Sequence, residues 1–154
     1  MVALLCACGD GSDTPTKNDA AEVYSAIIGQ LLADRAATTT TVKSTAKDHI
    51  SVFVEALGDG YVIDLSVQAG VVKSLEPVAL VRFIDNRAEA IERNEPGKPV
   101  RNDGMLVALG PLVDASSAQR KVLVRRYVDD NRHEDLLATV NASGASWAVV
   151  LSAQ

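Results

Sequence analysis

The chain has 154 residues, of which 47% are hydrophobic, 23% are charged and 4% are aromatic. This length suits a single domain, and the scarcity of aromatic residues means that Val, Leu, Ile and Ala must fill its core. A formal net charge of −5 argues against a nucleic-acid partner, which needs clustered Lys and Arg, and against attachment to anionic lipid through a basic patch.

The first thirteen residues form a short apolar run that contains two cysteines and then turns polar. The sequence from Leu5 to Cys8 resembles the lipobox of bacterial lipoproteins, in which a leucine three positions before a cysteine and a small residue just before it direct lipidation and cleavage. By position, the resemblance implies that Cys8 carries the lipid and that Ala7 is the small residue. Residues 2–7 are shorter than the ~7–15 apolar residues of a signal peptide, and no basic segment precedes them, so we expect the natural start upstream of Met1.

The resemblance implies a lipid-anchored protein of the bacterial cell envelope, held outside the cytoplasm by a membrane anchor on Cys8. Residues 1–18 would then be a signal remnant and a flexible polar tether, and residues 19–154 a single folded domain. The alternative is a cytoplasmic protein with a frayed N-terminus. A metal site needs more Cys or His near the two cysteines, and both histidines lie far away along the chain, so we predict neither a metal site nor a cofactor.

The domain begins with an amphipathic helix. Asn18 or Asp19 is a suitable N-cap, and we expect the helix to end near Arg35. Its apolar residues recur at i, i+4 and i+8 and predict one broad face for packing on a sheet: Val23, Tyr24, Ile27, Ile28, Leu31 and Leu32.

The rest of the domain consists of predicted strands with two further helices. Residues 78–85 include few polar residues, which predicts a central strand covered on both faces. Trp147, Val149 and Leu151 alternate along the last strand, so we expect Trp147 to anchor the buried face of the sheet. In chain order the predicted elements are a loop over 36–47, a strand over 50–57, a helix from Asp64 or Ser66 to Pro77, a strand over 78–85, a short helix over 86–93, a strand over 104–110, a turn over 114–120, and strands over 121–129, 135–141 and 146–152.

This order predicts an α+β fold, with the N-terminal helix and one or two further helices packed on one face of a curved, mainly antiparallel sheet that ends in a three-stranded meander. The order and the closing strand 147–150 resemble the cone-shaped domains of the nuclear-transport-factor-like and cystatin-like groups. The resemblance implies a ligand pocket inside the cone, and members of the first group include isomerases and dehydratases.

Two arginines are the first candidates for a binding site. Arg82 interrupts an apolar strand, and Arg126 alternates with valines beside Tyr127, so each guanidinium must reach water, a carboxylate or a bound anion. If Arg82, Arg126 and Tyr127 converge, they form a site for an anionic ligand. The alternatives are exposure on the outer face, which we favour, or internal pairing with Glu55, Asp64 or Asp85.

Acid–base chemistry would need a histidine with a carboxylate. His49 follows Asp48 and could be oriented by it or by Asp64, whereas His133 lies in an acidic stretch that lacks the spacing of a calcium loop. We expect ordinary surface exposure for both histidines. The sequence therefore predicts a non-enzymatic lipoprotein domain that binds an unknown protein or small ligand, and the alternative is a small enzyme with a cone-shaped pocket.

Lipidation of Cys8 is testable in a bacterial host. We expect the protein, expressed with its upstream sequence, to partition into detergent and to incorporate a fatty-acid probe. Cys8→Ser should abolish the label, whereas Cys6→Ser, the matched control, should keep it. Equal labelling of the wild type and Cys8→Ser would exclude the lipoprotein interpretation.

Overall fold

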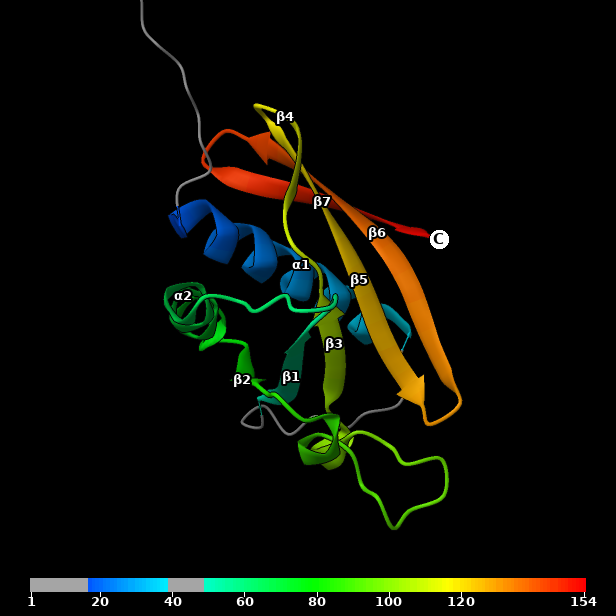
Figure 1. Ribbon diagram of the computed structural model, residues 1–154. Coiled ribbons are helices and arrows are strands. Elements are labelled where there is room, and N and C mark those ends of the chain that lie inside the picture. Colours follow the sequence, from blue (N-terminus) through cyan, green and yellow to red (C-terminus); the bar gives the residue numbers. More distant parts are fainter. Residues whose placement is uncertain (1–16, 39–48) are drawn as a thin grey trace, which may run out of the picture.

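The computed structural model describes residues 17–38 and 49–154, so Cys6, Cys8, the polar tether and most of the loop predicted over 36–47 lie outside the described residues. Two α-helices lie on one face of a seven-stranded mixed sheet, which confirms the predicted α+β class (Figure 1). The elements are α1 (Lys17–Thr38), β1 (Ile50–Ala56), α2 (Leu65–Leu75), β2 (Ala79–Phe83), the 3-10 turns η1 (Arg87–Glu89) and η2 (Arg101–Asp103), β3 (Met105–Leu109), β4 (Val113–Ser116), β5 (Gln119–Asp129), β6 (Arg132–Ser143) and β7 (Ser146–Ala153).

The sheet combines a parallel and an antiparallel half. Its strand order is β2-β1-β3-β5-β6-β7, with β4 pairing to β5. β1 is parallel to both β2 and β3, and α2 forms the crossover between β1 and β2. β5, β6 and β7 form the predicted antiparallel meander. The sheet is open, because β2 and β7 each have a strand neighbour on one side only among the described residues.

Two predictions about individual strands are wrong. β2 lies at an edge of the sheet and not at its centre, although its apolar run was typical of a central strand. A strand whose one face packs on a helix can carry apolar residues on its exposed face as well, so the two cases have similar sequences. Residues 114–116, predicted as part of a turn over 114–120, belong to β4 and pair with β5 in a hairpin.

The main core lies between the helices and the sheet. The predicted face of α1 is confirmed, since Val23, Tyr24, Ile27, Ile28 and Leu31 are all at most 1% exposed. The core also takes in side chains from both halves of the sheet, among them Val52, Val54, Val107, Leu109, Val122, Val124, Ala138 and Val140. One helix therefore covers a surface to which parallel and antiparallel strands both contribute.

A second, smaller core lies on the opposite face of the sheet. The connection from β2 to β3 crosses this face and buries Phe53 and Leu106 beneath Ile84 and Ala90. β1 and β3 are therefore covered on both faces, which explains why all five residues of β3 are buried.

Trp147 faces the helices together with Val149 and Leu151, as the alternation predicted. The indole is only half-buried, because it lies near the rim of the core. Its Nε1 donates a hydrogen bond to Glu22 of α1 (3.1 Å), and the guanidinium of Arg120 lies 5.9 Å from the ring centroid. Trp147 thus links β7 to α1 at the edge of the core, whereas the apolar side chains of α1 fill the centre of the core.

The two helices approach each other closely at Gly70. A Cβ placed on Gly70 would lie 2.7 Å from the Cβ of Ala21 in α1, closer than two carbon atoms can pack. The helix interior normally disfavours glycine by roughly 0.5–1 kcal/mol relative to alanine. The contact with α1 therefore accounts for a glycine in the middle of α2.

Gly70→Ala should lower the free energy of unfolding despite the higher helix propensity of alanine, because the added methyl group forces α2 away from α1. Gly29→Ala in α1 is the matched control, since nothing lies within 4 Å of its added Cβ. That substitution should stabilise the protein by about 0.5–1 kcal/mol. Urea denaturation measures both changes, and a stabilised Gly70→Ala protein would contradict the close packing of α1 on α2.

Candidate functional site

The structure does not bring the predicted anion-binding residues together. Arg82 lies on β2 and Arg126 on β5, and the sheet order places β1 and β3 between them. The Arg82 side chain is 64% exposed and pairs with Glu89 (2.8 Å), whereas Arg126 pairs with Glu134 on β6. Tyr127 donates its hydroxyl hydrogen to the carbonyl of Lys98 (2.7 Å). Neither arginine has the internal partner that the sequence suggested.

Arg126 lines a shallow cavity of about 370 Å³ near the end of α1. Protein oxygens already surround the cations there. The Arg35 guanidinium donates to the carbonyls of Gly104 (2.7 Å) and Asp103, and Arg126 donates through Nε to Glu134 (2.9 Å). These groups hold the 3-10 turn η2 and the end of β5 in place, so the cavity offers little to an anionic ligand.

The structure does not bring His49 close to Asp64, and Asp48, the other predicted partner of His49, lies outside the described residues. His49 is exposed immediately before β1, whereas Asp64 follows the loop at the other end of β1. The two ends of a seven-residue strand such as β1 lie roughly 20 Å apart, which is too far for Asp64 to orient His49. His133 is exposed on β6, with its Nε2 3.6 Å from Asp135. The described residues also include no group of three or more His, Cys, Asp or Glu that could hold a metal ion.

Arg120 is the buried arginine that the sequence interpretation missed. Its side chain is 3% exposed, its Nε lies 3.1 Å from Asp114 on β4, and its Nη1 donates to the carbonyl of Ser116 (2.9 Å). It occupies the buried face of β5 two residues before Val122, so period-two alternation could have identified it. Arg120 joins β4 to β5 and packs near Trp147, which is a structural role.

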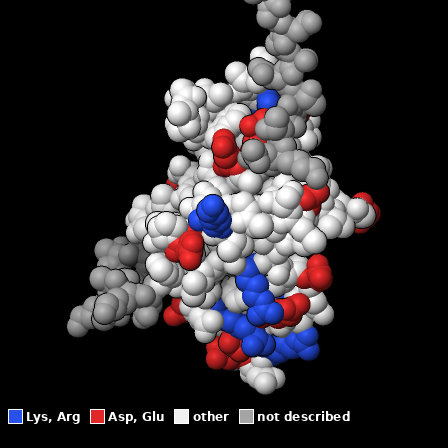
Figure 2. Space-filling view, turned by 90° about the vertical axis from the view of Figure 1, so that its left-hand side faces the viewer, with Lys and Arg blue, Asp and Glu red and all other residues white. Residues whose placement is uncertain are grey.

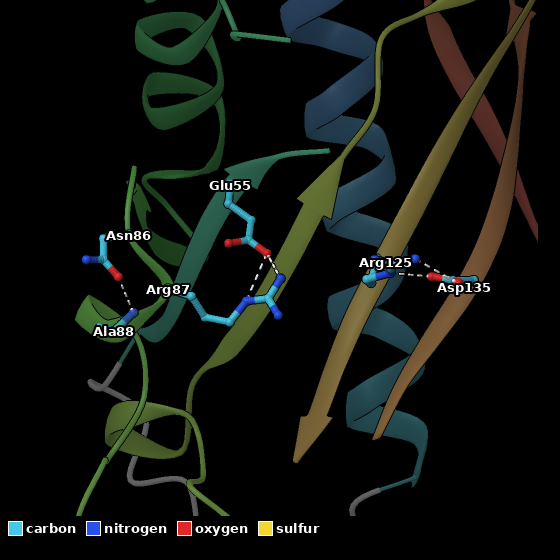
Figure 3. Close-up of polar contacts among 6 residues, drawn as sticks. All are labelled: Glu55, Asn86, Arg87, Ala88, Arg125 and Asp135. Carbon is cyan, nitrogen blue, oxygen red and sulfur yellow. Dashed lines mark hydrogen bonds and ion pairs between the residues drawn. The ribbon is translucent and has the colours of Figure 1, made fainter. Parts of the chain in front are cut away.

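A cleft of about 710 Å³ lies at the carboxyl ends of β1 and β2, where crevices of parallel sheets commonly bind ligands. Three acidic residues line it, Glu55, Asp64 and Asp85, and the first two have structural partners. Asp64 caps α2 by accepting from the amide of Ser66 (2.8 Å), and Glu55 accepts from the Nε of Arg87 (3.1 Å; Figure 3). Arg87 neutralises Glu55, and the helix N-terminus stabilises Asp64, so neither carboxylate is positioned as a general base.

The open face of the meander carries a cross-strand ion pair. Arg125 donates through Nε to Asp135 (2.7 Å), and Figure 3 shows the two side chains lying across β5 and β6. The hydrogen bond from Arg125 holds the pKa of Asp135 below its usual range. Both side chains are exposed and satisfy each other across β5 and β6, so the pair contributes to strand register.

The face formed by α2 and β2 combines an open strand edge with exposed apolar side chains. Eight large apolar side chains of the described residues are exposed, and five of them lie on or beside α2 and β2: Val62, Leu65, Val72, Val78 and Leu80. Figure 2 views this side of the molecule and shows a mainly uncharged centre, with Lys and Arg gathered toward its lower end among acidic residues.

A shallow groove of about 640 Å³ lies between α2 and β2, and polar side chains line it together with apolar ones: Gln68, Lys73, Glu76 and Arg82. Its helical wall includes Leu65, Ala69 and Val72, and its strand wall includes Val81 and Phe83. Leu65 is 79% exposed, although it begins a helix whose other face is buried in the core. An edge strand beside an apolar groove is the arrangement that accepts an added strand.

No family model, curated protein or solved structure matches this chain. The candidate site therefore rests on the geometry of α2 and β2.

The different burial of the arginines predicts different costs of losing their partners. Asp114→Ala leaves the guanidinium of Arg120 buried without a carboxylate, and we expect the free energy of unfolding to fall by about 3 kcal/mol. Arg126→Met removes a partly exposed pair and should cost at most about 1 kcal/mol. Urea denaturation compares the two variants, and equal small losses would mean that Arg120 is hydrated in solution.

Proposed function

We propose that this protein is a non-enzymatic binding module of the cell envelope, anchored to the membrane by a lipid on Cys8, that captures an extended segment of another protein. The captured segment adds as a strand to the free edge of β2 and packs side chains into the groove beside α2. The observation that carries this proposal is the open edge of β2 next to exposed apolar side chains.

The backbone of β2 offers hydrogen-bonding groups to such a strand. The amide of Ile84 donates to the carbonyl of Val54 on β1 (2.9 Å), and alternate residues of a strand direct their amide and carbonyl groups to opposite sides. The polar groups of Leu80, Arg82 and Ile84 therefore face β1. Those of Val81 and Phe83 face outward, where an added strand can pair with them.

The groove distinguishes β2 from the other free edge of the sheet. β7 is longer and has no charged residue, and its Val150 is 59% exposed. Along β2, by contrast, α2 provides one wall of a cavity. Pockets for alternate side chains give strand addition its specificity, which favours β2.

The anchor agrees with the composition of the chain between Cys8 and α1. Residues 9–16 are small, polar or proline and are long enough to separate a folded domain from a lipid surface. None of the helices in the described residues is long and apolar enough to cross a membrane. Covalently attached lipid with more than one acyl chain supplies stable membrane attachment without such a helix.

The alternative function, a small enzyme with a cone-shaped pocket, has less support. The open sheet encloses no cone in the described residues, and two of the three carboxylates of the cleft at the ends of β1 and β2, Asp64 and Glu55, cap a helix or pair with arginine. Binding by the edge of β2 needs no such chemistry.

Amide hydrogen exchange, followed by NMR with a neutral strand peptide of core sequence Val-Gln-Val-Leu-Val, tests the proposal. Saturating peptide should slow exchange of the Val81 and Phe83 amides, because these face the added strand. The amides of Arg82 and Ile84 should change little, since they already bond to β1.

Leu65→Glu should weaken the peptide roughly tenfold or more, because binding would bury its carboxylate in the groove. Val150→Glu also replaces an exposed apolar side chain by a carboxylate, on β7, and is the matched control that should bind normally. Protection of β7 amides in place of β2 amides, or binding that is lost in Val150→Glu and kept in Leu65→Glu, would contradict the proposal.

A further inference from the structure

We infer that the segment captured by β2 comes from a different protein and carries a carboxylate, Asp or Glu, on the residue that lies opposite Arg82, between apolar residues that enter the groove. This inference rests on the proposed function and specifies the chemistry of its partner.

The two faces of β2 dictate two kinds of side chain in the added strand. Val81 and Phe83 point toward α2, whereas Leu80 and Arg82 point to the opposite face. Residues directly opposite each other on neighbouring strands point to the same face and contact each other. The side chains opposite Val81 and Phe83 therefore enter the apolar groove, and those opposite Leu80 and Arg82 lie on the other face.

That other face has an excess of positive charge beside Arg82. A depression of about 430 Å³ is lined by Arg82, Arg93 and Arg101 from β2 and the β2–β3 connection, with Glu89 as its one carboxylate. Arg101 uses its Nε to hold the carbonyl of Ile91 (3.1 Å). Figure 2 shows basic side chains gathered at the lower end of the α2–β2 face.

The guanidinium of Arg82 can bind an incoming carboxylate in addition to its existing partner, Glu89. The Arg82 and Glu89 side chains are 64% and 42% exposed, and exposed pairs of this kind are weak. Arg82 lines both the depression and the groove, so a carboxylate on the added strand could reach its guanidinium without displacing the apolar contacts. A guanidinium can also bind two carboxylates through its separate N–H donors.

These requirements define a short sequence pattern. Antiparallel pairing is the more stable arrangement per residue, so we take the added strand as antiparallel to β2. Read from its N-terminus, it then places an apolar residue opposite Phe83, an acidic residue opposite Arg82, and apolar residues opposite Val81, Leu80 and Ala79. A peptide with the core Val-Glu-Val-Leu-Val satisfies this pattern.

A second copy of the chain does not satisfy it. In a two-fold antiparallel pairing of β2 with itself, Arg82 would lie opposite a residue of the same face: Val78, Leu80, Arg82 or Ile84. None of these is acidic. Self-pairing would therefore leave Arg82 against an apolar side chain or against its own symmetry mate, which charge complementarity disfavours.

Fluorescence anisotropy with three labelled peptides, whose cores are Val-Glu-Val-Leu-Val, Val-Gln-Val-Leu-Val and Val-Lys-Val-Leu-Val, tests the inference. We expect the glutamate peptide to bind about tenfold more tightly than the lysine peptide at low salt, with the glutamine peptide between them. The glutamate would lie opposite Arg82 as an ion pair, whereas the lysine would place a second positive charge there. Arg82→Glu should reverse the order. Lys73→Glu, a charge reversal on the α2 side of the groove, is the control and should keep the order.

The outcomes separate this inference from the proposed function. Equal binding of the three peptides, with Leu65→Glu still abolishing binding, would overturn the carboxylate requirement and leave strand capture intact. Binding of no peptide would overturn both. A concentration-dependent dimer in sedimentation that Leu65→Glu dissolves would identify a second copy as the occupant and overturn the inference of a different partner.

Discussion

The burial of α1 is the interaction on which the rest of the structure depends. The helix packs against α2 and against β6 and β7, so it joins the parallel and antiparallel halves of the sheet. Its position is fixed by Tyr24, whose hydroxyl donates to the carbonyl of Gly110 (2.9 Å) and lies 2.5 Å from that of Tyr61. Burial raises the pKa of Tyr24 well above its usual value, so the hydroxyl keeps its proton at any physiological pH.

This arrangement also determines which strand stays open. α1 occupies the centre of the helical layer, and α2, packed against it at Gly70, lies toward the β2 side of the sheet (Figure 1). The crossover from β1 through α2 returns the chain to the outer side of β1, and the next connection crosses the opposite face to reach β3. β2 therefore has a helix on one face, a largely exposed second face and an unpaired edge. β2 has only five residues and follows Pro77, and both features reduce aggregation through the free edge. A specific segment can still pair with the backbone of β2.

The charges of this acidic protein are distributed unevenly. Most of the arginines in the described residues pair with nearby carboxylates on the surface, such as Arg125 with Asp135 and Arg87 with Glu55, while Arg120 is buried in a structural pair with Asp114. The depression beside β2 differs because arginines from three segments share it with one carboxylate. The overall negative charge of the protein would repel an acidic segment at long range. The arginines of the depression would therefore favour an acidic segment only once it is bound next to them, within the screening length.

The sequence by itself determined the α+β class, the buried face of α1 and the alternation that places Trp147 toward the helices, because these follow from local periodicity. It narrowed the N-cap of α2 to Asp64 or Ser66, and the structure shows Asp64. It also supplied the lipobox-like stretch before Cys8, which lies outside the described residues. Only the tertiary structure decided that β2 is an edge strand, that Arg82 and Arg126 lie far apart in the sheet, and that Arg120 is the buried arginine. Strand order depends on which segments pair across long sequence separations, and the same apolar run fits a central or an edge strand. The groove between α2 and β2 therefore could not be predicted from the sequence, because it forms only when the β1–α2–β2 crossover places α2 beside the edge strand.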